Sequence, residues 1–405
     1  MFQSLAPCTE DELIEVIRWA MSGPHPLELV GSGSKRLLGR PMQVEQTLNL
    51  SSFAGISEYN PAELVITAGA GTPLSDVEAV LLENGQMLAF EPASYANMLG
   101  GKSSGTLGGI VACNVSGPRR ISAGAARDHL LGFSAVSGRG ESFKSGGKVH
   151  KNVTGYDLCK IMTGSWGTLA AIHEVSLKVL PIPEIVRTLI VPGLTDDQAI
   201  SLLSQGMASS TNISAAAHLP TEIAVQSQVQ RISKLGTAIT AMRIEGVRGS
   251  VESRTTELQS LFSSFGTLDS LHTHNSQVFW TEVRDASFFD DNKDILWRLS
   301  APPISGDKVV SELKKLAEVS VYYDWAGGLI WVSLSSGIEI DFRLVNKIAT
   351  EYGGHATLMR APENVRAIAP VFHPQSKVIA ALTGRLKESF DPFGILNPGR
   401  MYLGT

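Results

Sequence analysis

Two glycine-rich segments constrain the fold of this chain more than any other feature of its sequence. One is VGSGSK at residues 30–35, and the other is GTLGGIVACNVSGPRR at residues 105–120. Glycine backbone has no Cβ to obstruct a ligand, and consecutive N–H groups can surround an anion. A helix beginning near Gly109 would add its positive N-terminal end, so we expect the two segments to bind a diphosphate. For either segment alone, ordinary turn geometry is the alternative explanation.

Neither segment matches a common nucleotide-binding motif. Residues 31–35 follow an expected strand, as in the dinucleotide fingerprint G-x-G-x-x-G, but Arg36 occupies the third glycine position and no long helix follows before Pro41. Residues 101–103 resemble the end of a P-loop, yet the first glycine of that motif would fall at Ala96. The sequence therefore indicates neither a Rossmann fold nor a nucleoside triphosphatase.

Composition excludes several other classes of protein. With 405 residues, 43% of them hydrophobic, the chain can form two domains with substantial cores. A net charge of −5 argues against a nucleic-acid partner. The three cysteines, Cys8, Cys113 and Cys159, are too widely spaced for a disulfide framework or a metal cluster. We expect a cytoplasmic protein without direct membrane insertion, peripheral at the inner membrane only through partner subunits, because neither a signal peptide nor a membrane-spanning run is evident.

Helices and strands follow from periodicity and from turn residues. The first half should contain a capped helix over 9–21, strands within 27–30 and 56–71, a helix over 73–83, a strand over 87–92, a short helix over 157–162 and a strand over 170–180. The second half should contain helices over 195–207, 249–262 and 376–390 and strands over 237–246, 295–300 and 329–334. We expect a domain boundary at Pro181 and Pro183 and an α+β fold.

Four segments, taken together, resemble a known family. VGSGSK, GTLGGIVACNVSGPRR, the run over 146–183 and FDPFGILNPGRM have the order and approximate spacing found in FAD-binding proteins related to vanillyl-alcohol oxidase and p-cresol methylhydroxylase (PCMH). Within that superfamily, VACNVSGPRR, GGKVHKNVTGYDL and GGHATLMRAP are most similar to the FAD-binding E subunits of bacterial glycolate oxidases, also called glycolate dehydrogenases.

The resemblance implies a fold and a set of FAD contacts. It implies a PCMH-type FAD-binding domain of two α+β subdomains over 1–182, an α+β cap domain with an antiparallel sheet over 183–340, and a C-terminal helical segment over 341–405 that returns to the FAD domain. The residues that match the family's FAD-binding positions are Gly31, Ser32, Gly33, Ser34, Lys35, Thr106, Gly108, Gly109, Asn114, Ser116, Gly117, Gly155, Tyr156, Gly164, Gly167, Thr168 and Ile172.

The chain departs from its relatives at two points. Many relatives bond the flavin covalently through a histidine in the first loop, where this chain has Ser34, so we expect non-covalent FAD. Catalytic relatives carry an H-x-G-D-G-N-x-H metal motif in the cap domain, and this chain has no such run, so we expect no metal site. His272 and His274 lack a third ligand at a usual interval and read as a polar loop.

No catalytic residue can be assigned from the sequence. Oxidation of a hydroxy acid needs a cation for the carboxylate and a base for the hydroxyl proton, and the best candidates are Arg298, His355 and Arg360, for each of which a structural role is the alternative. Adjacent Arg119 and Arg120 could contact a phosphate or an acidic partner, although such a pair is usually solvated.

The resemblance implies a function within a complex. The chain would be the FAD-binding subunit of an assembly that oxidises glycolate to glyoxylate, together with a second FAD subunit and an iron–sulfur subunit that receives the electrons. Two alternatives stay open at this point. One is a stand-alone FAD-dependent oxidoreductase of a small 2-hydroxy acid or sugar, and the other is a structural subunit whose FAD undergoes no redox step.

Overall fold

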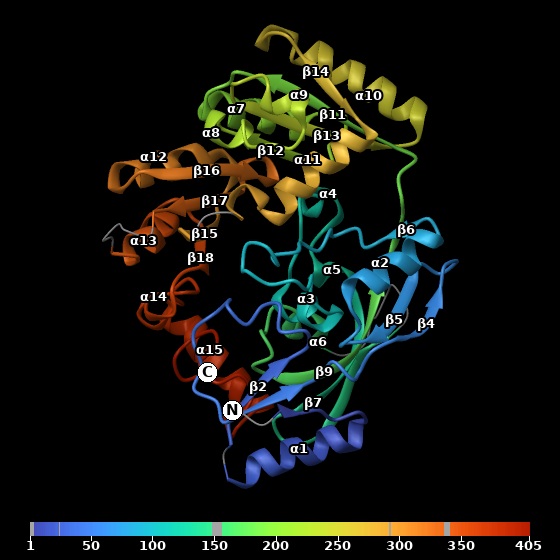
Figure 1. Ribbon diagram of the computed structural model, residues 1–405, viewed down its shortest axis with the longest axis vertical. Coiled ribbons are helices and arrows are strands. Elements are labelled where there is room, and N and C mark those ends of the chain that lie inside the picture. Colours follow the sequence, from blue (N-terminus) through green and yellow to red (C-terminus); the bar gives the residue numbers. More distant parts are fainter. Residues whose placement is uncertain (1–3, 24, 148–155, 291–292, 336–340) are drawn as a thin grey trace. The chain divides into compact units, whose positions relative to one another are not determined.

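The computed structural model describes residues 4–23, 25–147, 156–290, 293–335 and 341–405. The chain divides into two compact units (Figure 1). Unit 1 comprises residues 1–116, 124–182 and 374–405, and unit 2 comprises residues 117–123 and 183–373. The predicted boundary after residue 182 coincides with one division between the units. The predicted C-terminal segment over 341–405 is instead divided between them after His373, and the short segment 117–123 joins unit 2.

The described residues of unit 1 form three sheets. A parallel sheet has the order β1-β3-β2, an antiparallel sheet has the order β4-β5-β9-β7-β8, and β10 pairs with β6. The strands are β1 (Ser4–Leu5), β2 (Leu27–Val30), β3 (Gln46–Asn49), β4 (Ile56–Asn60), β5 (Val65–Gly69), β6 (Gln86–Met87), β7 (Leu130–Ser137), β8 (Ser142–Gly146), β9 (Ala170–Lys178) and β10 (Leu180–Pro181). The strand predicted over 87–92 is therefore wrong beyond Met87, where the chain turns.

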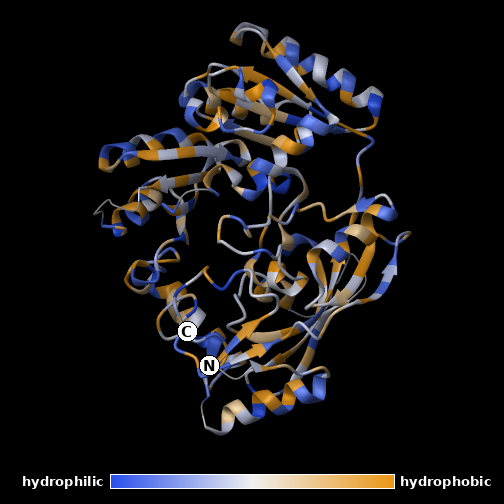
Figure 2. Cartoon of the chain, in the orientation of Figure 1, coloured by the Kyte–Doolittle hydropathy of each residue, from blue (hydrophilic) through white to orange (hydrophobic). Residues whose placement is uncertain are grey.

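The helices of unit 1 begin close to their sequence signals. They are α1 (Glu10–Ser22), α2 (Leu74–Glu83), α3 (Leu107–Cys113), α5 (Ala126–His129), α6 (Leu158–Met162) and α15 (Lys377–Phe390). Thr9 caps α1 by accepting a hydrogen bond from the Glu12 amide at 3.2 Å. Figure 2 shows hydrophobic and hydrophilic residues mixed along α1, whose buried residues Leu13, Ile17 and Ala20 recur at helical spacing. They pack into one core with Leu27 and Leu48 of the parallel sheet and with Leu396 of the C-terminal segment.

A buried ion pair fastens the C-terminal segment to unit 1. The Lys387 ammonium on α15 donates to the Asp391 carboxylate at 2.7 Å, to the Thr168 carbonyl at 2.7 Å and to the Leu396 carbonyl at 3.0 Å. The carboxylate also accepts from the amides of Ile395 and Leu396. Because both charges are satisfied on several sides, the pair joins α15, the loop after it and the turn before β9 at a defined geometry.

Unit 2 is built on one antiparallel sheet with the order β14-β11-β13-β12-β16-β17-β15-β18. Its strands are β11 (Ile185–Pro192), β12 (Ala215–Leu219), β13 (Ile239–Gly246), β14 (Asp269–His272), β15 (Ile295–Ser300), β16 (Val319–Asp324), β17 (Leu329–Leu334) and β18 (His355–Arg360). Its α-helices are α4 (Arg120–Ala123), α7 (Asp196–Ala208), α8 (Thr221–Ala224), α9 (Gln230–Ser233), α10 (Arg248–Leu261), α11 (Thr273–Asp285), α12 (Gly306–Leu316), α13 (Arg343–Glu351) and α14 (Glu363–Ile368). Its 3-10 helices are η1 (Ser263–Phe265), η2 (Ser287–Phe289), η3 (Pro303–Ser305) and η4 (Trp325–Gly327).

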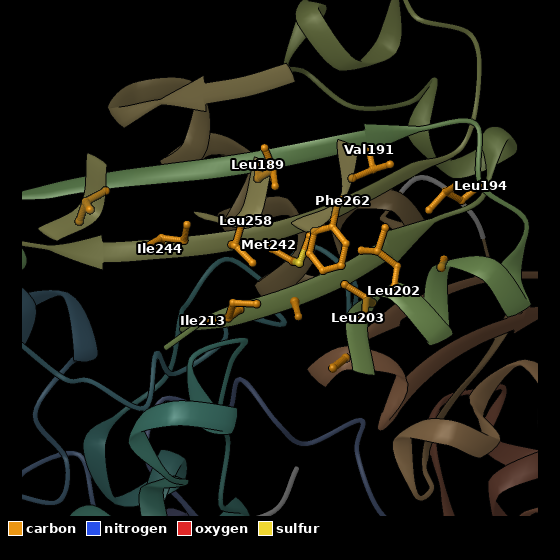
Figure 3. Close-up of a cluster of buried hydrophobic side chains, with 14 residues drawn as sticks. Leu189, Val191, Leu194, Leu202, Leu203, Ile213, Met242, Ile244, Leu258 and Phe262 are labelled. Carbon is orange, nitrogen blue, oxygen red and sulfur yellow. The ribbon is translucent and has the colours of Figure 1, made fainter. Parts of the chain in front are cut away.

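A hydrophobic core lies between this sheet and the helices α7 and α10. Figure 3 shows the Phe262 ring among the side chains of Met242, Leu202 and Leu203, all of which are buried. Leu189 and Val191 of β11 contribute alternate residues to the same cluster, as expected for a strand with one buried face. The α+β class predicted from the sequence is confirmed.

Replacing Lys387 tests how much the C-terminal anchor contributes to stability. Lys387→Met should destabilise unit 1 by about 3–5 kcal/mol, because it leaves the Asp391 carboxylate buried without its cation. Urea unfolding followed by circular dichroism measures the effect. Lys377→Met, at an exposed position of the same helix, is the matched control and should change stability little. Equal losses in the two variants would show that the buried pair contributes nothing specific.

Candidate functional site

A cleft in unit 1 collects most of the glycine-rich positions singled out in the sequence. It contains about 800 Å³ of empty space, part of it open to solvent. The cleft is lined by the end of β2 and the loop after it, by α3, by the turn before β9, by β9 and by the C-terminal segment. The predicted FAD-binding residues among its lining are Gly31, Ser32, Gly33, Ser34, Lys35, Thr106, Gly108, Gly109, Gly167 and Ile172.

The two glycine-rich segments contact each other because their glycines lack side chains. A Cβ on Gly31 would lie 2.3 Å from Thr106 Oγ1, and a Cβ on Gly105 would lie 2.7 Å from Lys35 Nζ. Gly33 and Gly105 also have φ angles of +75° and +108°, which favour glycine. Glycine at positions 31 and 105 is therefore favoured by the close approach of side chains from the other segment, and at 105 also by the φ angle.

Free amides come chiefly from the first segment. Within the described residues, the backbone N–H groups of Ser32, Gly33, Ser34 and Lys35 donate no hydrogen bond, so they can face a ligand. The helix of the second segment begins at Leu107, two residues before the position predicted. Its Leu107 and Gly108 amides donate to the carbonyls of Thr72 and Ala70 at 3.0 and 2.8 Å, so they hold the helix against the chain after β5.

The cleft is electropositive beside the first segment. Burial lowers the pKa of Lys35, and among the described residues its ammonium has no carboxylate partner. Arg400 donates to the Lys35 carbonyl at 2.7 Å and thereby fixes the loop. Arg36 is neutralised by an ion pair with Glu28. An anion bound beside Lys35 would offset the cost of burying its charge.

The turn before β9 forms another wall. Trp166 and Gly167 have φ angles of +56° and +70°, and the Trp166 amide donates to the Ala112 carbonyl of α3 at 2.9 Å. Asn397 holds this turn, because its Nδ2 donates to the Trp166 carbonyl at 2.7 Å while its Oδ1 accepts from the Leu29 amide at 2.8 Å. Ser165, only 7% exposed, has a hydroxyl without a hydrogen-bond partner among the described residues.

Several predicted FAD-binding residues lie outside the lining, where side-chain bonds occupy them. Asn114 ends α3 in the left-handed conformation and accepts from the Arg127 amide at 3.1 Å. Ser116 accepts from the Ala126 amide at 3.0 Å, and Thr168 donates to the Ser165 carbonyl at 2.7 Å. These residues support the local backbone.

The remaining predicted positions fall elsewhere. Gly164 donates through its amide to the Val111 carbonyl at 3.2 Å, and Gly117 belongs to unit 2. Tyr156 is 89% exposed, and Gly155 lies outside the described residues.

Two further residues of the lining, Asn397 and Arg400, have roles that depend on the tertiary fold. Asn397 and Arg400 belong to the quoted run FDPFGILNPGRM, yet no role was assigned to them. Their side chains form hydrogen bonds with the backbone of Trp166, Leu29 and Lys35, which are remote in sequence. The polar residues of the NPGR run after a helix were the available signal.

Candidate residues in unit 2 take different roles from those expected. Arg119 is buried and pairs with Glu245 at 2.6 Å, so the expectation of a solvated pair is wrong for it. Arg360 donates to the carbonyls of Phe289 and Asp294, which indicates a structural role. His272 contacts Arg187, and His274 is exposed. Among the described residues, no group of three or more potential ligands could hold a metal ion.

Arg298 and Arg120 both lie over the ring of Trp325 in unit 2. His355, the remaining candidate base, is an accessible residue at the start of β18.

Within the described residues, no helix is long and apolar enough to cross a membrane.

Comparison with known proteins identifies the family. The FAD binding domain family matches residues 4–146. The chain is 34% identical to glycolate oxidase subunit GlcE of Escherichia coli, over 96% of each chain, and 24% identical to glycolate oxidase subunit GlcD of Bacillus subtilis, over 98% of this chain and 88% of that one. Among solved structures, a 4-ethylphenol oxidase from Gulosibacter chungangensis has a similar fold, with a TM-score of 0.74 at 14% identity over 99% of this chain and 89% of that one.

A structure of p-cresol methylhydroxylase is likewise similar in fold, with a TM-score of 0.73 at 12% identity over 99% of this chain and 88% of that one. The PCMH-type fold expected from the resemblance is thereby confirmed, and so is FAD as the cofactor. The chain belongs to the family of glycolate oxidase subunit GlcE and is an FAD-dependent oxidoreductase.

Proposed function

We propose that this chain is the FAD-binding subunit of a complex that oxidises glycolate to glyoxylate and passes the electrons to an iron–sulfur subunit, with a second FAD subunit alongside. The observation that supports it is the cleft of unit 1, in which two glycine-rich segments enclose unpaired amides and a cation. The full-length similarity to a glycolate oxidase subunit supports glycolate as the substrate and membership of a multi-subunit complex.

The residues of the cleft fit the parts of FAD. The amides of residues 32–35 and the Lys35 ammonium suit the two negative charges of the diphosphate. The apolar lining of Leu29, Ala170 and Ile172 suits a ring system. When bound, FAD accepts the hydride equivalent released by oxidation of the substrate.

FAD is held without a covalent bond. Ser34 occupies the loop position at which many relatives attach the flavin, and the lining formed by the described residues contains neither histidine nor tyrosine. Cys113 is the remaining nucleophile of the lining, and burial raises the pKa of its thiol. Because the thiolate is the nucleophilic form, Cys113 is a poor candidate for attachment.

The electrons leave through partner subunits. Conversion of glycolate to glyoxylate releases two electrons and two protons. The chain has three cysteines, whereas an iron–sulfur cluster is usually held by four, which supports a separate subunit as the acceptor. Any attachment of the complex to a membrane would come through the same partners.

Anaerobic addition of glycolate separates this function from its alternatives. The absorbance band of oxidised flavin, at about 450 nm, should persist when glycolate is added to the isolated, FAD-loaded chain and should fall when glycolate is added to the assembled complex. Bleaching of the isolated chain would indicate a stand-alone oxidoreductase. A flavin in this subunit that is never reduced in any assembly would indicate a structural role.

Gly31→Ala should weaken FAD binding at least tenfold, a loss of about 1.4 kcal/mol. The added Cβ would lie 2.3 Å from Thr106 Oγ1 and must separate the two segments. Gly101→Ala is the matched control, since its Cβ would meet only the Ala96 carbonyl oxygen at 3.7 Å. Fluorescence titration of apoprotein with FAD measures both affinities, and equal affinities would contradict the assignment of the cleft.

Precipitation of the holoprotein with acid tests the mode of attachment. All of the flavin should appear in the supernatant, because unfolding destroys a non-covalent site. Flavin that remains in the pellet would show a covalent bond. Cys113→Ser, analysed in parallel, would then reveal whether that thiol forms it.

A further inference from the structure

The parallel sheet of unit 1 has one buried face and one open face. The register pairs Ser4 and Glu28 with Thr47, and Val30 with Asn49, so these five side chains share a face. Leucines that alternate with them lie on the other face, which packs against α1 in a hydrophobic core. All five side chains of the open face remain at least partly exposed. Four of them are polar, so the open face suits a hydrophilic ligand.

A hollow lies on this open face. It contains about 790 Å³ of empty space, part of it open to solvent. Its lining consists of Ser4, Val30, Thr47 and Asn49 of the strands, residues 31–33 and Arg36. Residues 30–33 and Arg36 also line the cofactor cleft. The first glycine-rich segment, with its free amides, therefore borders both the cleft and a polar hollow.

An ion pair orients a carboxylate at this boundary. Arg36 Nε donates to Glu28 Oε1 at 2.9 Å, and its Nη2 donates to Glu28 Oε2. The same Nη2 donates to Thr47 Oγ1 at 3.2 Å. The Glu28 side chain is 13% exposed, and Glu28 lines the cleft. Because parallel N–H groups of one guanidinium contact both oxygens, the carboxylate is held in one orientation where the cleft and the hollow adjoin.

Hydrogen-bonding capacity remains around this ion pair. Within the described residues, Glu28 Oε1 accepts only from Arg36, although a carboxylate oxygen has two lone pairs. Arg36 Nη1 and Asn49 Nδ2 donate no hydrogen bond to any of these residues. Asn49 Oδ1 accepts from the Ser51 amide at 2.9 Å, which orients the side-chain amide. An acceptor and several donors thus lie close together, and the vicinal hydroxyls of a sugar, which both donate and accept, match them.

The place of the ion pair beside the first glycine-rich segment indicates which sugar it would meet. The free amides of residues 32–35 suit the diphosphate of FAD, and the apolar lining of the cleft suits its ring system. In FAD the adenosine ribose is joined directly to the diphosphate. A diphosphate bound by residues 32–35 would therefore bring that ribose close to Arg36, the next residue of the chain. The ribityl chain leads to the flavin ring, so it would follow the apolar lining instead.

We propose that Glu28 and Arg36 form a subsite for vicinal sugar hydroxyls, which binds the adenosine ribose of FAD and so selects FAD over flavins that lack adenosine. The proposal rests on the assignment of the cleft to FAD in the proposed function. Glu28 accepts from the ribose hydroxyls, and Arg36 holds the carboxylate in position while its remaining N–H groups donate to the hydroxyl oxygens. The competing explanation is that the ion pair only fastens the loop to β2.

Fluorescence titration of the full-length apoprotein with two ligands tests the subsite. One ligand is FAD, and the other is the FAD analogue whose adenosine lacks the 2′- and 3′-hydroxyls. The unaltered chain should bind FAD about tenfold more tightly, because the analogue leaves the charged pair without hydrogen-bond partners. Glu28→Gln should bind the two ligands with nearly equal affinity. Since both ligands carry the same charge, the altered charge of the protein cancels from this comparison.

Glu45→Gln is the matched control, because Glu45 is an acidic residue next to β3 that pairs with His25 outside both linings. It should retain the preference for FAD. Arg36→Lys keeps the charge but loses the bidentate contact, so it should reduce the preference, and it provides the test if Glu28→Gln does not fold. Melting curves verify that each variant is folded. An unchanged preference in folded Glu28→Gln, or equal affinity of the unaltered chain for the two ligands, would overturn the proposal.

A third ligand separates the adenosine ribose from the ribityl chain. The FAD analogue that lacks the ribityl 2′-hydroxyl should bind more weakly than FAD, if at all, by the same factor in the unaltered chain and in Glu28→Gln. A factor that disappears in Glu28→Gln would show that the carboxylate meets the ribityl chain, which would overturn the assignment to the ribose.

This proposal and the proposed function fail in different ways. An unchanged FAD affinity in Gly31→Ala would refute the assignment of the cleft. A retained preference for FAD in Glu28→Gln, with the effect of Gly31→Ala intact, would refute the ribose subsite alone. Failure of the assembled complex to oxidise glycolate would refute the proposed function and leave the subsite intact.

Discussion

The close contact between Gly31 and Thr106 is the constraint on which the cofactor-binding unit depends. It brings the end of β2 against the start of α3, and the neighbouring contact of Gly105 with Lys35 closes the same junction. A side chain at Gly31 would meet Thr106 and push the segments apart, whereas at Gly105 the φ angle of +108° disfavours any residue with a Cβ. Because glycine lets the two segments pack closely, the unpaired amides of residues 32–35 and the buried Lys35 ammonium lie in the same part of the cleft.

The C-terminal segment completes this unit by polar contacts. Asn397 bonds to both Leu29 and Trp166, Arg400 bonds to the Lys35 carbonyl, and Lys387 bonds to the carbonyl of Thr168. These contacts all go to the chain around the cleft. Residues at the end of the sequence thus fix loops near its beginning, and buried bonds of this kind lose strength quickly when one partner moves. Stability and cofactor affinity should therefore be coupled through this segment.

The sequence reveals the glycine positions because their requirement is local, and the helix starting after Thr9 because its cap is local. It fails where tertiary contacts decide the outcome. Asn114 and Ser116 occur in the expected motif, but their side chains bond to the amides of Arg127 and Ala126, a pairing that spacing alone does not reveal. Residues 87–92 begin with a hydrophobic run that suggested a strand, yet only Met87 of that run pairs with a strand, β10. Whether these motif residues contact FAD as the resemblance implies stays a prediction.

The second glycine-rich segment shows how one motif can serve two chemical purposes. Gly108 and Gly109, within α3, line the cleft of unit 1. Arg119 and Arg120, which follow the helix, belong to unit 2, where one pairs with Glu245 and the other lies over Trp325. The two neighbouring arginines thus contact different groups. Arg119 pairs with the Glu245 carboxylate, and Arg120 lies over the Trp325 ring. One short run of sequence therefore contributes both to the cofactor cleft and to the packing of unit 2.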